Sequence, residues 1–360
     1  MAGAVLSRRS WRRFRRLFDE LALCPLLDYR AYRQTEGKVY RFTGRLESVT
    51  GGHTLWIRGE KLTVPVALDG AETYVLPMQE GGGQGGFFDP AEEAPERIRW
   101  DRVSTLTDEA KVFVGGTLEL RDDYRTFAAS PGKPLLLIFY DGPDRSLAVR
   151  AIRAGRHRNE YWNPITPYAL ILGALCLIVL ALSFLPRPAF RITAIVAFTA
   201  VFIPLFPMVP PGVLFTVIYR RLWWQARIFR AYRDLARFPL IYLEDGMGKG
   251  RLPGGEGYGA VSLDEAPQGL EDGKIPLLIP EEEKRKKDKW FIYGALTEPE
   301  GNPVKPADVF AVYGALPGKP ETLARRYSRK AYVFEIAAWL LLLAGIGLNA
   351  FFVRAIIVLL

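Results

Sequence analysis

The sequence predicts a multi-pass α-helical membrane protein with a cytoplasmic antiparallel β-domain. Three apolar runs carry almost no charge, residues 38–155 alternate apolar and polar side chains, and arginines gather beside every apolar run. Of the 360 residues, 49% are apolar, and the formal net charge is +9. This composition excludes a disordered polyelectrolyte and is typical of a folded chain with segregated apolar and basic segments.

Residues 1–30 are expected to form a basic amphipathic helix on anionic lipid. Apolar side chains recur every three or four residues from Trp11 to Leu21, and arginines fill the other positions. The segment lacks the uninterrupted apolar stretch of a secretory signal. A basic helix packed on the protein itself is the alternative. The residues expected at the membrane surface are Arg8, Arg9, Trp11, Arg12, Arg13, Phe14, Arg15 and Arg16.

Residues 38–155 are expected to form the β-domain, as a small barrel or a sandwich. Tyr40, Phe42 and Leu46 begin a pattern of alternating or short apolar runs, which is typical of half-buried strands. Glycine and aspartate pairs such as Asp69-Gly70 separate these runs and predict turns. The domain ends shortly before the first long apolar run, so we expect it to lie against the membrane.

Transmembrane helices are predicted at 168–185, 190–209 and 331–351, the last with an apolar tail to residue 360. The first run has no charge over 18 positions, which at 1.5 Å per residue gives about 27 Å, close to the hydrocarbon thickness of a bilayer. The second contains only Arg191 and ends in a cluster of prolines, and the third contains Glu335 and Asn349.

Two cytoplasmic segments are expected between the second and third runs. Residues 213–238 predict an interfacial basic helix, although the second span could instead continue to Tyr219. Residues 239–330 form a glycine-rich segment in which Tyr-Gly-Ala recurs at 258, 293 and 313, as a weak repeat or as edge strands that turn at glycine. The interfacial helix adds these residues to the expected membrane surface: Arg220, Arg221, Trp223, Trp224 and Arg227.

The distribution of arginine predicts the orientation. Basic residues precede the first run, follow the second and precede the third, whereas only Arg187, Arg191 and Arg354 fall on the other side. The positive-inside rule therefore places the N-terminal region and residues 212–330 in the cytoplasm, with the C-terminus outside. We expect the chain in the inner (cytoplasmic) membrane.

The segments Lys111-Val-Phe-Val-Gly-Gly-Thr-Leu-Glu-Leu and Pro134-Leu-Leu-Leu-Ile-Phe-Tyr-Asp-Gly, followed by an apolar run, resemble the OB-like β-domains that lie beside membranes in the NfeD and GIDE groups. The resemblance is confined to the β-domain. In the GIDE ubiquitin ligases the chemistry belongs to a C-terminal RING rich in cysteine and histidine, and this chain has no cysteine or histidine after Cys176. The resemblance implies an interaction module close to lipid, without the ligase or protease parts.

No catalytic, cofactor or metal site is predicted. The chain has two cysteines, Cys24 and Cys176, and two histidines, His53 and His157, too few for a cysteine-based zinc module. The glycine-rich stretch after Asp245 lacks the Gly-Lys-Ser/Thr ending of a phosphate loop. We therefore expect no enzyme activity and no cofactor.

The predicted function is a non-enzymatic integral membrane scaffold or adaptor, and the alternative is an accessory subunit of a transporter or membrane-protease assembly. The expected partners are anionic lipid head groups and a protein, which could be a second copy of the chain, but not nucleic acid. Small and polar residues in the apolar runs are expected to mediate close helix packing. These are Ala169, Gly173, Gly345, Gly347 and Asn349.

Overall fold

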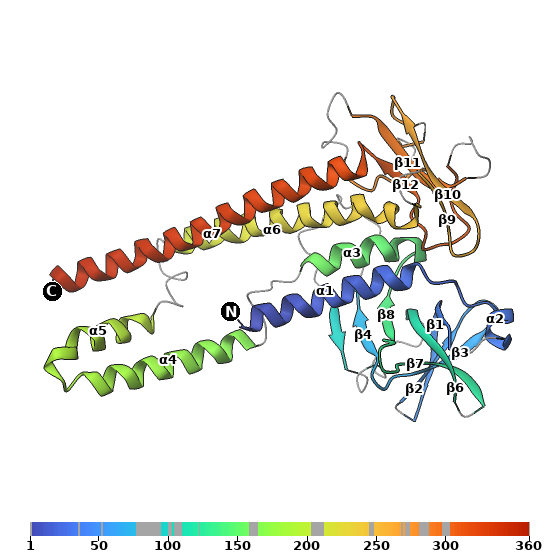
Figure 1. Cartoon of the computed structure of the whole chain (residues 1–360). Coiled ribbons are helices and arrows are strands. Elements are labelled where there is room, and N and C mark those ends of the chain that lie inside the picture. The colour runs from blue at the N-terminus through green and yellow to red at the C-terminus, as the bar shows by residue number, and fades with distance from the viewer. Residues whose placement is uncertain are drawn as a thin grey trace. The chain divides into compact units, whose positions relative to one another are not determined.

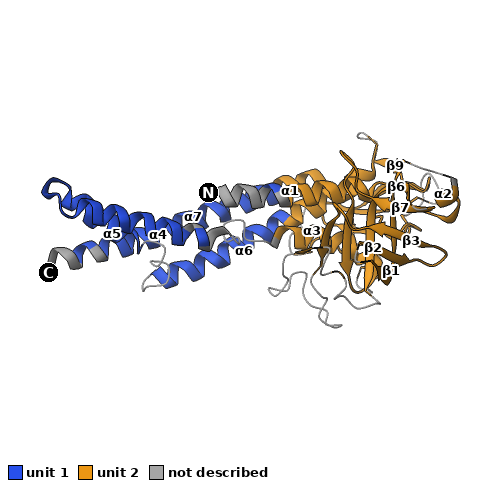
Figure 2. Ribbon diagram, turned by 90° about the horizontal axis from the view of Figure 1, so that it is seen from below, with its two compact units in different colours: residues 1–10, 159–230, 327–360 blue, residues 11–158, 231–326 orange. Residues whose placement is uncertain are grey.

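The computed structural model describes residues 2–34, 37–51, 53–76, 95–99, 103, 110–121, 123–157, 165–202, 212–244, 248–267, 269–270, 274–280, 288–296 and 303–359. The chain divides into two compact units, which Figure 2 colours separately. Unit 1 comprises residues 1–10, 159–230 and 327–360, and unit 2 comprises residues 11–158 and 231–326. Each unit is therefore assembled from segments that are distant in sequence.

Unit 2 is built on an eight-stranded sheet, in the order β1-β2-β3-β7-β6-β8-β4-β5, in which β1 also pairs with β6 (Figure 1). The strands β1, β2, β3, β7 and β6 therefore close into a ring. The β3–β7 and β4–β8 pairs are parallel, and the other pairs are antiparallel. The strands are β1 (Val39–Thr50), β2 (Thr54–Arg58), β3 (Thr63–Ala67), β4 (Glu72–Val75), β5 (Glu96–Ile98), β6 (Lys111–Arg121), β7 (Tyr124–Ala128) and β8 (Leu136–Tyr140).

The ring encloses a hydrophobic core. Phe42 of β1, Ile57 of β2 and Val112 and Val114 of β6 belong to one cluster of buried apolar side chains. Because successive side chains of a strand point to opposite faces, the residues between them face outward. This alternation places the odd-numbered residues of the first part of β1, beginning with Arg41, on the outer face of the ring.

Helices α1 (Ala2–Ala22) and α2 (Tyr29–Gln34) precede the eight-stranded sheet in sequence, and α3 (Leu147–His157) follows it. From Trp11 onward, α1 packs its apolar stripe against the outer face of the sheet. The ring centroid of Phe14 lies 4.6 Å from that of Tyr74, and the centroid of Phe18 lies 6.0 Å from that of Phe113. A Cβ atom added to Gly115 of β6 would lie 2.9 Å from Leu21 Cδ1, so glycine permits this close approach.

A second, four-stranded antiparallel sheet completes unit 2, in the order β12-β11-β10-β9. Two copies of the recurrent Tyr-Gly-Ala sequence lie within β10 and β11, and the third begins one residue before β12. A Cβ atom at Gly294 would lie 2.5 Å from the Val304 carbonyl oxygen, and one at Gly314 would lie 2.6 Å from the Pro276 oxygen. Close backbone packing thus explains the glycines. The strands are β9 (Lys249–Arg251), β10 (Gly257–Leu263), β11 (Trp290–Ala295) and β12 (Gly314–Leu316).

Unit 1 consists of helical segments. Its helices are the part of α1 up to Ser10, α4 (Ile165–Phe184), α5 (Arg191–Ala200), the part of α6 (Gly212–Arg237) up to Arg230, and the part of α7 (Pro320–Leu359) from Tyr327. Figure 1 shows α6 and α7 side by side, and within unit 1 the rings of Trp223 and Trp339 meet edge to face at 6.3 Å. An ion pair joins Arg230 to Glu335. Exposed apolar side chains cover much of α4, α5 and α7.

The prediction of a multi-pass helical membrane protein is wrong. Among the described helices, α7 alone is long and apolar enough to cross a bilayer, over Pro320–Phe352. In the other two predicted spans, at 168–185 and 190–209, the described apolar helices are Leu170–Phe184 and Pro188–Ala200, which are both shorter than 18 residues. The chain instead has a mixed α/β fold with a large sheet.

The second predicted span falls short because its helix ends early. Helix α5 ends at Ala200, ahead of Pro204, and a proline ring inside a helix clashes with the preceding turn and removes a backbone donor. Residues 203–211 lie outside the described residues. The third predicted span, 331–351, lies within α7, which begins earlier because Pro320 and Glu321 suit the first turn of a helix.

The packing of α1 can be tested with Phe14→Ala. The Phe14 side chain is 0% exposed, so its truncation should leave a cavity and lower the free energy of unfolding by about 3–5 kcal/mol. Denaturant unfolding of the full chain in detergent measures the change. The matched control is Arg12→Ala on the exposed face of α1, which should change stability by less than about 0.5 kcal/mol. Equal, small effects of both substitutions would contradict the packing of α1 on the sheet.

Candidate functional site

A cavity of about 1100 Å³ lies beside β1 and β2 in unit 2. It is lined by the middle of β1, the end of β2 and the turn that follows it, the start of β6 and the end of β8. The segment that leads into α2 and residues 307–309 ahead of β12 also line the cavity. Pockets of a few hundred to about 1000 Å³ commonly hold small molecules. The cavity is therefore the first place to look for a binding site.

The strand register places three basic residues in one row across the cavity. Arg45 of β1 is the direct partner of Arg58 on β2 and of Lys111 on β6. Directly opposite residues share a face of the sheet and have Cβ atoms about 5 Å apart. All three line the cavity, and we call Arg58, Arg45 and Lys111 the basic row.

The three members of the basic row differ in their partners. Lys111 donates to the Asp144 carboxylate and to the Gly142 carbonyl, both at 2.8 Å. Asp144 also accepts from the Tyr140 hydroxyl at 3.1 Å, and burial together with this carboxylate raises the pKa of Tyr140. Among the described residues, Arg45 and Arg58 form no ion pair, and both are exposed.

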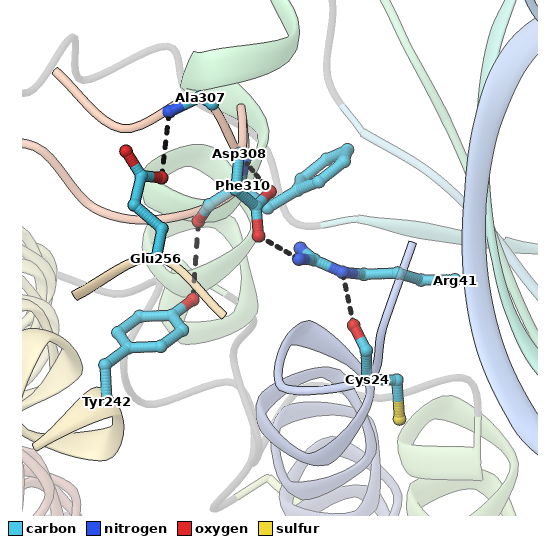
Figure 3. Close-up of polar contacts among 7 residues, drawn as sticks. All are labelled: Cys24, Arg41, Tyr242, Glu256, Ala307, Asp308 and Phe310. Carbon is cyan, nitrogen blue, oxygen red and sulfur yellow. Dashed lines mark hydrogen bonds and ion pairs between the residues drawn. The ribbon is translucent and has the colours of Figure 1, made fainter. Parts of the chain in front are cut away.

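A buried ion pair holds one wall of the cavity in place (Figure 3). The Arg41 side chain, on the same face of β1 as Arg45, is 1% exposed and pairs with the Asp308 carboxylate. Its Nε donates to the Cys24 carbonyl at 2.6 Å, and its guanidinium lies 5.0 Å from the centre of the Phe310 ring. Within the described part of the chain, Arg41 Nη1 has no hydrogen-bond partner.

The loop that carries Asp308 has further hydrogen bonds, drawn in Figure 3. The second carboxylate oxygen of Asp308 accepts from the Phe310 amide at 3.0 Å. Glu256 accepts from the Ala307 amide at 3.1 Å, and the Tyr242 hydroxyl donates to the Phe310 carbonyl at 3.4 Å. Burial is the main cause that raises the pKa of Tyr242, so its hydroxyl stays protonated and remains a donor. The loop is thus anchored on both sides of Asp308.

A second ionisable cluster in unit 2 joins α1, α3 and the end of α6. Burial and the nearby Asp234 carboxylate raise the pKa of Asp19 to about 6, against the lowering influence of Arg15 and Arg156. Arg156 Nε donates to Asp234 at 2.5 Å, so Arg156 is paired with Asp234 and not with Asp19. These charged groups neutralise one another where the three helices meet, and we assign the cluster a structural role.

The structure places the predicted membrane-surface residues of α1 on two different faces. Trp11 and Phe14 are buried within unit 2, whereas Arg9, Arg12, Arg13 and Arg16 are exposed. Arg13 Nε lies 2.7 Å from Glu72 Oε1, and Arg15 donates to the Gly155 carbonyl at 3.0 Å. The side chain of Arg8 lies outside the described residues. The aromatic residues of the stripe are therefore covered by the sheet.

The remaining predicted site residues lie in unit 1. On α6, Arg220 and Arg221 are exposed, Trp223 is buried, Trp224 is half-buried, and Arg227 lies 5.8 Å from the Trp223 ring. A Cβ atom at Gly345 would lie 2.8 Å from Phe215 Cβ, so this glycine allows α7 to approach α6. Asn349 is also buried, whereas Gly173 and Gly347 face open space. The side chain of Ala169 lies outside the described residues.

Sequence reasoning missed the cavity, the basic row and the Arg41–Asp308 pair. The alternation of Tyr40, Arg41 and Phe42 places Arg41 outward but does not show what covers it. In the described residues, no group of three or more His, Cys, Asp or Glu side chains could hold a metal ion. Comparisons with protein-family models, curated proteins and solved structures found no match for the chain.

The importance of the buried pair can be tested with Asp308→Ala. This substitution leaves the Arg41 guanidinium buried without its carboxylate, so we expect a loss of about 3–5 kcal/mol in the free energy of unfolding. Replacing both residues by leucine should cost less than the sum of the two single substitutions, because neither charge is then stranded. Chemical denaturation of the four proteins completes the cycle. Additive single effects would show that the pair is not coupled.

The Asp19 cluster predicts a pH dependence of stability. The folded-state pKa of Asp19, about 6, lies above its ordinary value of 3.8, so the folded chain binds this proton more tightly than the unfolded chain. The contribution of this group is most favourable below its ordinary pKa and is lost as the pH rises through about 6. Asp19→Asn should therefore stabilise the protein more at neutral pH than at about pH 4, as measured by thermal unfolding. A larger benefit at the lower pH would contradict the raised pKa.

Proposed function

We propose that this chain is a non-enzymatic membrane-anchored scaffold, in which α7 crosses the bilayer and unit 2 binds partners. The observation that carries the proposal is the apolar exterior of α7. Only 17% of its most apolar window is buried inside the protein, whereas the core helix of a soluble protein would be mostly buried. Large exposed apolar surfaces are typical of lipid or partner contacts.

The charges that flank α7 support one orientation. Arg325, Arg326, Arg329 and Lys330 lie at the start of the helix, and Arg354 lies near its far end. By the positive-inside rule, the chain that precedes α7 is cytoplasmic and the C-terminus is outside, in the inner membrane. Unit 2 would then face the cytoplasm.

Exposed aromatic residues on unit 2 support a soluble protein partner. Tyr29 is 54% exposed and Tyr124 is 55% exposed, and the Tyr124 ring meets Trp56 edge to face at 5.5 Å. Aromatic side chains are enriched in protein interfaces because they bury a large area at low entropic cost. The resemblance of the β-domain to membrane-apposed OB-like domains points to the same role.

An accessory subunit of a membrane assembly is the second candidate function. The observation that favours it is the open space beside Gly347, which lies on the exposed apolar part of α7 in unit 1. Small residues allow the backbones of two helices to approach closely inside a membrane. In that case the partner would be another membrane protein, and unit 1 would contact it.

The anchor can be tested by alkaline extraction of membranes from cells that make the full chain. We expect the wild-type protein to stay in the pellet and Leu340→Arg/Leu343→Arg to be extracted. Both leucines are exposed near the middle of the apolar stretch, where an arginine costs about 2.5–3.5 kcal/mol. The matched control is Val333→Arg, which is also exposed but lies close to Lys330, where an added charge reaches the interface.

A tag after Leu360 tests the orientation in the same cells. We expect the tag to be accessible to an added protease once any outer membrane and cell wall have been permeabilised. Extraction of the wild-type chain at high pH would refute the anchor, and a tag protected on the cytoplasmic side would refute the orientation.

A further inference from the structure

The electrostatic repulsion between Arg45 and Arg58 in the cavity of unit 2 destabilises the sheet. Arg45 and Arg58 are direct cross-strand partners, and like charges in this position destabilise a sheet. Neither forms an ion pair with a described residue. Lys111 extends the row on the other side of Arg45, and Lys61 lines the cavity beyond Arg58. Because Lys111 is paired with Asp144, the unpaired positive charge of the basic row lies on the two arginines.

Charge and geometry both favour an oxyanion between the two arginines. A guanidinium presents a planar set of donors that pairs with two oxygens at once. Two arginines that are directly opposite, with Cβ atoms about 5 Å apart, can both reach one tetrahedral anion. A phosphate group has enough oxygens to accept from both. A carboxylate has only two oxygens and would satisfy one guanidinium in this way.

We propose that the cavity binds a phosphate monoester, with its phosphate group held between Arg45 and Arg58. The volume of about 1100 Å³ far exceeds that of phosphate alone, so the phosphate is one end of a larger molecule. Glu47, Glu60 and Asp28 also line the cavity. These carboxylates accept hydrogen bonds from hydroxyl or ammonium groups and repel a second anionic group, so the rest of the ligand is not anionic.

The segment beside β1 suits such a ligand. Leu26, which is bridged to Arg41 of β1, and Tyr29, the first residue of α2, line the cavity, and both are about half exposed. Asp308 also lines the cavity and is already paired with Arg41, so its charge is largely neutralised. This site lies within unit 2, and the proposal does not depend on the membrane anchor.

The experiment measures thermal unfolding of the full chain in detergent, with inorganic phosphate or with sodium chloride at the same ionic strength. We expect phosphate to raise the melting temperature of the wild-type protein. Arg45→Gln and Arg58→Gln should each abolish this rise. The matched control, Arg121→Gln, removes an exposed arginine from β6 outside the cavity and should keep the rise.

The same variants separate a binding site from a structural one. Without phosphate, Arg58→Gln should melt at a higher temperature than the wild type, because it relieves the repulsion with Arg45. Arg58→Lys keeps the charge and the fold but loses the fork of donors, so it should weaken phosphate binding several-fold. ³¹P line broadening on titration with phosphate measures this binding directly.

Phosphate monoesters occur as soluble molecules and as lipid head groups, and a reconstitution separates these sources. In nanodiscs of phosphatidylcholine, added phosphate should raise the melting temperature. If a lipid head group fills the site, nanodiscs that contain phosphatidate will show no further rise, and if the ligand is soluble the rise will be equal in both. Absence of any phosphate effect on the wild type, or an effect that persists in both glutamine variants, would overturn the proposal.

Discussion

The contact between Arg41 and Asp308 joins three parts of unit 2 at one buried charge. Arg41 comes from the first strand of the ring, Cys24 follows α1, and Asp308 lies on the loop ahead of β12. A buried guanidinium that loses its carboxylate has no water to replace it, so the three segments must be placed together. The same loop carries Phe310, whose ring lies 5.4 Å from that of Phe113 on β6. One wall of the cavity therefore depends on the Arg41 guanidinium, which does not itself line the cavity.

Many strands of the β-domain could be predicted from local sequence patterns, but the cavity and its basic row could not. The alternation from Tyr40 to Leu46 marks β1, and the glycine and aspartate pairs mark its turns, because both signals act over a few residues. The basic row depends on register between Arg45, Arg58 and Lys111, which no local pattern encodes. A register shift between Leu46 and Ser48 makes simple counting along β1 fail beyond that point.

An amphipathic or apolar pattern in the sequence does not show whether lipid or protein covers the apolar side chains. The stripe of α1 suits lipid and protein equally, and the rings of Tyr74 and Phe113 decide where Phe14 and Phe18 lie. Hydropathy alone likewise overstated the number of spans, because a run of apolar residues says nothing about where the helix ends. The proline-rich end of the second run limited its helix, whereas α7 continues well beyond the predicted segment at its N-terminal side.

The Arg41–Asp308 contact also constrains how the chain is made. The two residues are 267 positions apart, so at the usual 5–20 residues per second a ribosome takes about 13–53 seconds to travel from one to the other. During that interval the strands β1 to β8 have all been synthesised, yet the guanidinium on β1 still lacks its carboxylate. In this state the Arg41 guanidinium stays hydrated, because the loop that carries Asp308 has not yet been synthesised. Unit 2 is therefore completed only when the segment that leads into α7 has been synthesised. The folding of unit 2 is in this way tied to the synthesis of the apolar helix α7.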